Sequence, residues 1–184
     1  MFSKDESEAI LMYISETPPA INAILRGYNI KLDDFLVQSS KILIKTFNKI
    51  TSSLNKEIVY RGVDGDYGFT EDFIIDSLIS TSTEYSEALF FTSDDINKKI
   101  IMEITLPIGV PFLEIKFLSS TYKKFIPSTE GDERILLPGK MKVRSIHKNF
   151  DGVNIIKCDY LQYRDVESTL YVFEEKCRLL SCQE

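Results

Sequence analysis

The chain changes its apolar periodicity once, near residue 55, and this change limits the folds open to it. Before that point apolar side chains recur at helical spacing, and after it short apolar runs alternate with turn residues. A sequence in which helices come first and strands follow favours an α+β fold over a doubly wound parallel sheet. We therefore predict N-terminal helices packed on a mixed β core of two sheets.

Three helices are expected in the first 55 residues. Residues 7–14 carry apolar groups at helical spacing and precede a pair of prolines, which stop a helix. Residues 20–26 form a short second helix that ends at Gly27, and residues 33–54 form a longer third helix with one apolar face. A last amphipathic helix is expected over residues 166–180.

The rest of the chain has the pattern of short strands separated by turns. Strands are expected over residues 57–61, 73–79, 99–106, 111–117, 135–137, 141–147 and 153–160. A hairpin-like turn at residues 107–109 is expected to join two of these strands. A short helix over residues 83–91 is expected to begin with a Ser or Thr cap.

The 184 residues form one domain in this interpretation, because no linker, repeat or low-complexity segment divides them. The helical part comprises residues 1–55, the β core residues 56–160 and the C-terminal helix residues 165–181. The hydrophobic fraction of 43% and charged fraction of 27% are ordinary for a globular domain.

Composition argues against several classes of function. The net charge of -6 lacks the basic footprint of a nucleic-acid-binding protein. No apolar run approaches the roughly 20 residues of a membrane span, and no signal peptide is recognisable. Cys158, Cys177 and Cys182 are odd in number and lack metal-ligand spacing, and His147 is the single histidine. We expect a soluble monomer with reduced thiols and no metal, nucleic-acid or membrane partner, in the cytoplasm of its producer or of a target cell.

Three short motifs stand at the edges of apolar runs. They are Tyr60-Arg61-Gly62, Ser80-Thr81-Ser82, and the acidic cluster Glu130-Gly131-Asp132-Glu133, which leads into Arg134-Ile135-Leu136-Leu137-Pro138-Gly139. Each alone has a structural explanation: an arginine paired with nearby acids, hydroxyls that cap a helix, and acids in a polar loop. Their order and their intervals of about 20 and 50 residues favour a functional explanation.

In this order the motifs resemble those of the NAD-dependent mono-ADP-ribosyltransferases of the Arg–Ser–Glu class. The N-terminal region is similar as well, because Tyr13, Ile21-Asn22 and Leu25-Arg26 look like that family's Tyr…Ile-Asn-x-x-Leu-Arg helix. The resemblance covers most of the chain but not the last helix. It implies NAD as co-substrate, bound in a cleft between the two sheets, and a protein side chain as the acceptor of ADP-ribose.

The resemblance also implies a role for each matching residue. Dinucleotide binding would fall to Asn22, Arg26, Arg61, Gly62, Ser80, Thr81 and Ser82, with the arginines on phosphate. The catalytic residues would be Glu133, Ser80 and Glu130, because a carboxylate is needed near the positive charge that develops on the ribose. Tyr122 and Phe125, in the loop before the third motif, are candidates for contacting the protein target; alternatively, they tuck under their own loop.

One residue departs from the family pattern. The family's catalytic glutamate stands directly before the apolar triple, where this chain has Arg134, and Glu133 comes one residue earlier. Strand side chains alternate, so a shift of one residue turns a group to the opposite face, and a literal alignment gives an inactive site. We expect a bulge at Gly131 to direct Glu133 into the site, with Glu130 or Asp132 as the first acid of the family's paired acids.

The leading interpretation is a small mono-ADP-ribosyltransferase of the kind found among bacterial toxin subunits, effectors and phage proteins. In this family an acid two positions before the catalytic glutamate favours arginine as the acceptor, and a glutamine favours asparagine. The absence of a glutamine here favours arginine. Two alternatives stay open: an NAD glycohydrolase that gives ADP-ribose to water, and a catalytically inactive binding module, suggested by Arg134.

Overall fold

The computed structural model describes residues 2–15, 20–50, 52–63, 71–118, 120–124, 133–162 and 164–182. Its helices are α1 (Lys4–Ser15), α2 (Ala20–Arg26), α3 (Asp34–Thr46), α4 (Tyr85–Phe90), α5 (Ser120–Lys123) and α6 (Val166–Ser181). Its strands are β1 (Glu57–Val63), β2 (Phe73–Ile75), β3 (Ile79–Ser82), β4 (Ile100–Leu106), β5 (Phe112–Glu114), β6 (Glu133–Leu136), β7 (Gly139–Lys148) and β8 (Asn154–Gln162). The expected α+β class is confirmed.

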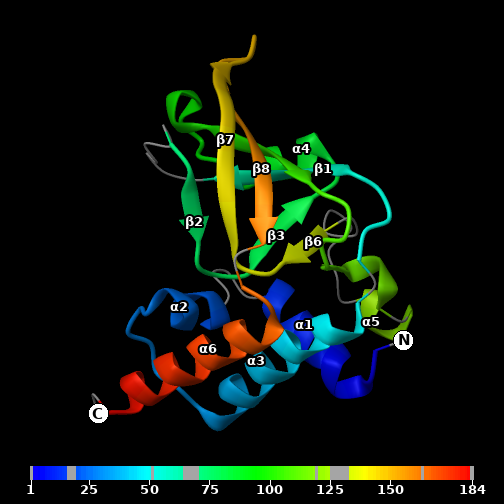
Figure 1. The fold of residues 1–184 in the computed structure, drawn as a ribbon, viewed down its shortest axis with the longest axis vertical. Coiled ribbons are helices and arrows are strands. Elements are labelled where there is room, and N and C mark those ends of the chain that lie inside the picture. Colours follow the sequence, from blue (N-terminus) through cyan, green and yellow to red (C-terminus); the bar gives the residue numbers. More distant parts are fainter. Residues whose placement is uncertain are drawn as a thin grey trace.

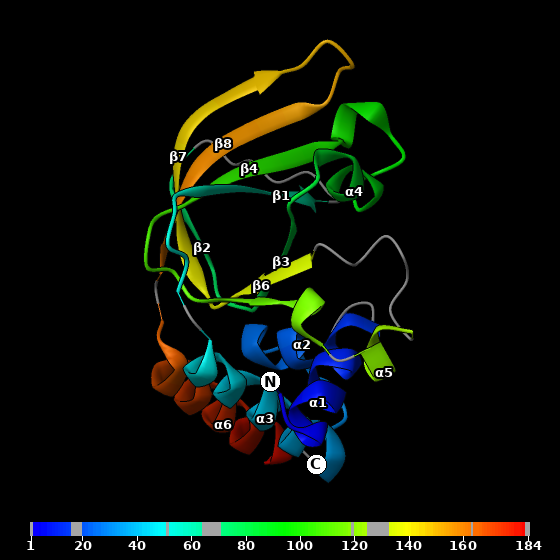
Figure 2. The same cartoon turned by 90° about the vertical axis from the view of Figure 1, so that its right-hand side faces the viewer.

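Helices α1, α2, α3 and α6 form a layer at one end of the molecule, against a bent sheet (Figures 1 and 2). Asp33 and Asp165 cap α3 and α6, because their carboxylates accept the backbone N–H groups of Leu36 and Ser168 at 2.7 and 2.8 Å. The buried faces of the helices meet residues of β6 in one apolar core, which includes Ile10, Ile24, Leu43, Phe173 and Ile135. The N-terminal helices are thus packed directly against the strand that follows the acidic motif.

The eight strands are hydrogen-bonded in the single order β2-β7-β8-β4-β1-β3-β6-β5. The β4–β8 pair is parallel and its neighbours are antiparallel, so the sheet is mixed as expected. The expected division into two sheets is wrong, because β1 and β3 are joined by the backbone pair Tyr60–Ser82. That junction is a single pair, whereas β1 pairs with β4 over all its residues, Glu57–Val63. We call β2-β7-β8-β4-β1 the first wing and β3-β6-β5 the second wing.

The expected hairpin between residues 99–106 and 111–117 is also wrong. Both edges of β4 are occupied, by β1 and β8, so β5 pairs with β6 in the second wing. The strand in this region is shorter than expected, since it ends at Glu114 and a 3-10 turn follows over Ile115–Phe117. Local sequence shows that two strands follow one another, but not which edges are free to pair.

Other differences are local. The third helix ends at Thr46, followed by a 3-10 turn to Lys49, and the expected strand at residues 73–79 is divided between β2 and β3 in different wings. Helix α4 begins after Glu84, whose side chain caps nothing, in place of the expected Ser or Thr cap. Among the described residues, none of the helices has both the length and the apolarity required to cross a membrane.

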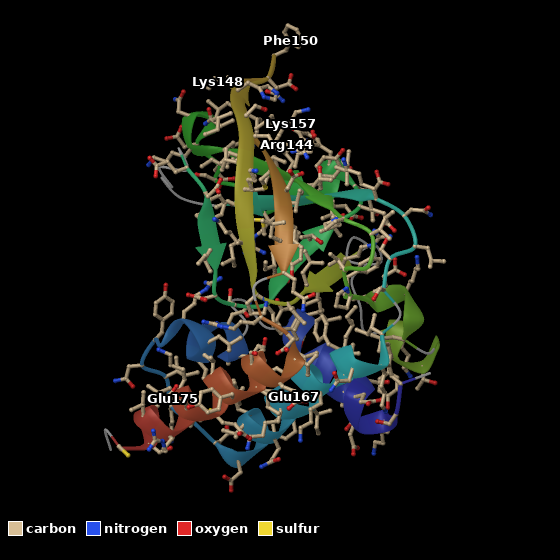
Figure 3. The ribbon with its side chains drawn as sticks, viewed as in Figure 1. Arg144, Lys148, Phe150, Lys157, Glu167 and Glu175 are labelled. Carbon is tan, nitrogen blue, oxygen red and sulfur yellow. The ribbon has the colours of Figure 1, made fainter. Side chains whose placement is uncertain are left out.

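Basic residues labelled in Figure 3 lie at one end of the molecule, and the labelled acidic residues lie at the other end. Arg144, Lys148 and Lys157 lie on the β7–β8 hairpin, whereas Glu167 and Glu175 lie on α6 at the other end (Figure 3). None of these residues belongs to the motifs described below, so they provide control sites for substitutions.

Gly62 of β1 lies where α4 approaches the sheet, and it gives a test of this packing. A Cβ atom at Gly62 would lie 2.0 Å from the backbone oxygen of Ala88 and 3.1 Å from the Cβ of Phe91. We expect Gly62→Ala to lower the free energy of unfolding by about 3 kcal/mol, the upper end of overpacking costs, in urea denaturation. Gly109→Ala is the control, because nothing lies within 4 Å of its added Cβ, and its left-handed φ of +89° costs only about 1 kcal/mol. Equal losses in the two variants would contradict the packing argument.

Candidate functional site

The second and third motifs lie on adjacent antiparallel strands. Ser80 of β3 is paired with Ile135 of β6, and Ser82 is paired with Glu133. Opposed residues in an antiparallel pair share a face, and successive residues alternate between faces. Ser80, Ser82 and Glu133 therefore lie on one face of the second wing, and Arg134 lies on the other.

This register answers the question that the sequence raises about Arg134. Ile135 packs in the core shared with the helices, whereas Leu136 packs in the separate core of the sheet. Glu133 alternates with Arg134 and therefore lies on the helix side with Ile135. The pairing of β3 and β6 is unbroken over Glu133–Leu136, so Glu133 reaches the face of Ser80 without a bulge in this segment. The bulge expected at Gly131, and the alternative first acids Glu130 and Asp132, lie outside the described residues.

The phenol of Tyr13 joins the helices to the Ser-Thr-Ser motif. Its oxygen lies 2.9 Å from Ser80 Oγ and accepts a hydrogen bond from Asn22 Nδ2 at 3.3 Å. Asn22 Nδ2 also donates to the backbone oxygen of Leu78 at 3.1 Å, and both Tyr13 and Asn22 are buried. Two residues of the N-terminal motif are thus bonded to β3 or to the residue before it.

Arg61 and Glu133 lie within electrostatic reach of the same phenol. Burial raises the pKa of Tyr13, the negative charge of Glu133 raises this pKa further, and the positive charge of Arg61 lowers it. Arg61 Nη1 donates a hydrogen bond to the backbone oxygen of Ser80 at 2.8 Å. The structure therefore brings together one residue from each motif, Arg61, Ser80 and Glu133, around the buried phenol.

Arg26 and Asn22 add polar groups beside this cluster. Arg26 is exposed, and its Nε and Nη2 donate to the buried Ser77 Oγ at 3.2 and 3.0 Å, three residues before Ser80. Asn22 Oδ1 is buried and has no hydrogen-bond donor within the described part of the chain. An acceptor in this condition fits a ligand that brings a donor, such as a hydroxyl or an amide.

Thr81, Ser82 and Gly62 have partners that explain them without a ligand. The Thr81 hydroxyl donates to the backbone oxygen of Arg134 at 2.9 Å. Ser82 Oγ donates to Glu87 at 2.6 Å and accepts the backbone N–H of Glu84. Gly62 faces α4, as described above. Their assignment to dinucleotide binding stays a prediction, and the residue of the serine motif that joins the cluster is Ser80.

Tyr122, one of the two residues expected to contact a protein target, lies on the short helix α5, where a loop was expected. Tyr122 is half-buried and packs against the helical core, which favours the alternative that it tucks under its own loop. Phe125 lies outside the described residues.

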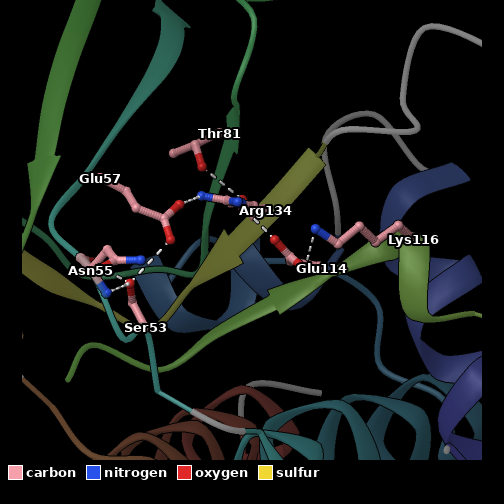
Figure 4. A network of polar contacts seen from close by, with 7 residues as sticks. All are labelled: Ser53, Asn55, Glu57, Thr81, Glu114, Lys116 and Arg134. Atoms are coloured by element: carbon pink, nitrogen blue, oxygen red, sulfur yellow. Dashed lines mark hydrogen bonds and ion pairs between the residues drawn. The ribbon is translucent and has the colours of Figure 1, made fainter. Parts of the chain in front are cut away.

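The network around Arg134 was missed by the sequence reasoning (Figure 4). Its guanidinium forms ion pairs with Glu57 of β1 and, at 2.8 Å, with Glu114 of β5. Lys116 Nζ pairs with the other oxygen of Glu114 at 2.8 Å, and the guanidinium lies 4.5 Å from the centroid of the Phe112 ring. An arginine inside a short apolar strand was the available signal, since a cation in such a position needs acidic partners.

We compared the chain with known protein families, sequences and solved structures. No family profile and no curated protein sequence matches the chain. Among solved structures, C3stau2 from S. aureus with NAD has a TM-score of 0.66 and 18% identity, over 88% of this chain and 89% of that one. This chain has the fold of the mono-ADP-ribosyltransferase toxins.

Two further solved structures have a similar fold. An ADP-ribosyltransferase from Clostridium botulinum has a TM-score of 0.63 and 19% identity, over 86% of this chain and 87% of that one. Exoenzyme S from Pseudomonas aeruginosa, solved with human 14-3-3 protein beta and Carba-NAD, has a TM-score of 0.62 and 16% identity, over 85% and 74%. The predicted resemblance to ADP-ribosyltransferases is confirmed at the level of the fold.

Two hollows in the described surface are lined by residues other than Arg61, Ser80 and Glu133. One, of about 580 Å³, is lined by residues 29–34, 37, 177, 178, 180 and 181, and the other, of about 660 Å³, by residues 71–72 and 143–146. Residues 64–70 and 125–132, which adjoin β1 and β6 in sequence, lie outside the described part of the ADP-ribosyltransferase fold. A cleft for NAD beside the cluster remains a prediction.

Tyr13→Phe tests the buried cluster through its pH dependence. The pKa of Tyr13 is raised above its unfolded value of about 10, so its stabilisation is complete below that pH and is lost as the pH rises through the folded pKa. In urea denaturation, the variant should lose stability less steeply above pH 10 than the wild type. At pH 7 it should be about 1–2 kcal/mol less stable, because Asn22 and Ser80 lose a hydrogen-bond partner.

Tyr171→Phe is the matched control, because Tyr171 is exposed on α6. It should change neither the stability at pH 7 nor the slope above pH 10. Parallel pH curves for Tyr13→Phe and the wild type would show that the phenol is not held as described.

Proposed function

We propose that this chain is an NAD-dependent mono-ADP-ribosyltransferase that modifies a protein side chain. The observation that carries the proposal is the convergence of Arg61, Ser80 and Glu133 around Tyr13, from two wings of the sheet and α1. The fold supports it, and so do the NAD and Carba-NAD in structures of proteins that share the fold.

The dinucleotide would be bound by the cations at this cluster. Arg61 holds a permanent positive charge beside Ser80, and a guanidinium can form paired hydrogen bonds to phosphate oxygens. Arg26 supplies a second cation beside Ser77, on the segment that leads into β3. Asn22 Oδ1 offers a buried acceptor close to Tyr13.

The reaction breaks the bond between nicotinamide and the ribose. Nicotinamide leaves with the bonding electron pair, and positive charge develops on the ribose. The carboxylate of Glu133 would stabilise that charge, since a fixed opposite charge lowers the energy of the transition state. The acceptor nitrogen then forms the new bond to the ribose carbon and loses a proton. Arg134 does not oppose these steps, because it lies on the other face of β6.

The acceptor of ADP-ribose comes from a second molecule, so this chain constrains it less than it constrains the co-substrate. Arginine is the acceptor that the sequence favours, because no glutamine precedes Glu133 in the acidic motif. The inactive-module alternative loses the observation that suggested it, since Arg134 is directed away from Ser80. The glycohydrolase alternative is separated by its product, free ADP-ribose.

Glu133→Gln tests the proposed catalytic carboxylate. We expect nicotinamide release from NAD to fall by about 10³-fold or more while NAD still binds, because the amide keeps the shape of the side chain and removes its charge. Release is measured by chromatography, and NAD binding by calorimetry. Glu167→Gln, on the exposed surface of α6, is the control and should retain wild-type turnover.

Arg61→Met tests the proposed phosphate contact. Its main effect should be a higher KM for NAD, because the guanidinium is assigned to binding.

Incubation with labelled NAD and a cell extract shows the product: labelled protein supports the transferase, and free ADP-ribose alone supports the glycohydrolase. A wild-type protein that releases no nicotinamide, or a Glu133→Gln variant with full turnover, would contradict the proposal.

A further inference from the structure

Arg134 is the residue at which this chain departs from the family pattern, and its contacts give it a different role. We infer that Arg134 is a positioning residue that holds the second wing against the first, so that Glu133 of β6 is set relative to Arg61 of β1. This inference rests on the proposed function. It concerns the geometry of the site, since Arg134 lies on the far face of β6 from Ser80.

The contacts of Arg134 reach three other strands. Its side chain is only 12% exposed and forms ion pairs with Glu57 at the start of β1 and Glu114 at the end of β5 (Figure 4). Its backbone oxygen accepts the Thr81 hydroxyl of β3 at 2.9 Å. Ser53 Oγ donates to the remaining oxygen of Glu57 at 3.1 Å, which holds that carboxylate in place.

The ion pair with Glu57 crosses the junction between the wings. Among the described residues, the backbone joins β1 to β3 through the one pair Tyr60–Ser82, so backbone pairing across the junction is sparse. The Arg134–Glu57 pair connects β6 directly to β1, across the intervening β3. Glu57 and Arg61 belong to the same strand, and Arg134 and Glu133 are neighbours on another. The ion pair therefore links the strand of the proposed phosphate-binding residue to the strand of the proposed catalytic carboxylate.

The same network opposes a slip of β6 by one residue. Such a slip would exchange the faces of Glu133 and Arg134, because side chains alternate along a strand. Glu133 would then face the acids Glu57 and Glu114, and like charges at close range repel. Arg134 is thus a residue whose charge selects the register that directs Glu133 toward Ser80.

Stability alone does not explain this arrangement. Buried ion pairs cost desolvation energy, and apolar residues of similar volume often give equal or greater stability. Only 8% of the Glu114 side chain and 12% of the Arg134 side chain are exposed, so this cost applies here. The network is better explained by the geometry that it fixes, and this distinction can be measured.

The experiment compares nicotinamide release in Arg134→Met, Arg134→Lys and the wild type. We expect kcat to fall by about 10²-fold in Arg134→Met, the scale of a small misplacement of a reacting group, with KM for NAD near the wild-type value. Arg134→Lys should recover part of the loss, because an ammonium can pair with one of the two acids. The control is Lys157→Met, which removes an ion pair within the first wing, where Lys157 Nζ lies 3.1 Å from Glu103 Oε1. This variant should leave kcat unchanged.

Arg134→Met leaves two acids unpaired and can fail to fold, so a second variant is needed. The triple variant Arg134→Met, Glu57→Gln, Glu114→Gln removes all three charges together. We expect it to fold and to bind NAD, with the same loss of kcat. The inference would be overturned if the folded triple variant kept the wild-type kcat. It would also be overturned if its kcat fell by no more than its fraction of folded protein fell.

Failure of the proposed function is distinguishable from failure of this inference. If the wild type releases no nicotinamide, the proposed function fails, and the positioning role is then measured by hydrogen exchange of the Ile135 and Leu136 amides. Faster exchange in the triple variant than in Lys157→Met would support the role of Arg134 in fixing β6. Unchanged exchange would overturn it.

Discussion

The alternation of side chains along β6 is the constraint on which the candidate site depends. Ile135 is buried among the helices, and Leu136 is buried in the core of the sheet, so the orientation of the strand is fixed by two adjacent apolar residues. Glu133 then lies with Ser80, and Arg134 lies with Glu57 and Glu114. The separation of a proposed catalytic acid from a neighbouring cation follows from apolar packing and pleat geometry.

The cluster is assembled where the two wings and the helical layer meet. Tyr13 comes from α1, Arg61 from the first wing, and Ser80 and Glu133 from the second wing. Since the wings share one backbone pair in the part of the chain that the structure describes, side-chain contacts supply much of the connection between them. The ion pair of Arg134 with Glu57 crosses this junction, and the buried phenol of Tyr13 links α1 to the opposite face of the second wing.

Much of the fold follows from local patterns in the sequence. Apolar periodicity and a flanking glycine define α2 with the bounds that the structure shows, and the order of helices and strands gives the α+β class. The pairing of β5 with β6 and the continuity of the sheet depend on which strand edges are free, and that information is not local. Sequence reasoning could identify neighbouring strands along the chain but not their partners in space.

The sequence indicated which residues meet at the candidate site. It did not indicate which face of β6 each side chain takes. The order of Arg61, Ser80 and Glu133 identified groups that the structure brings together. Counting from the apolar triple puts Arg134 in the place of the family's glutamate, whereas the pairing of β6 with β3 puts Glu133 on the face of Ser80. Strand pairing, and not the number of residues to a motif, decides which face a side chain takes.

A co-crystal structure with Carba-NAD is the most direct measurement of the central claim. The account predicts the pyrophosphate on Arg61, the nicotinamide-side ribose beside Ser80 and the carboxylate of Glu133, and Arg134 still paired with Glu57 and Glu114 on the other face. A dinucleotide bound elsewhere, or a Glu133 carboxylate directed away from the ribose, would contradict it.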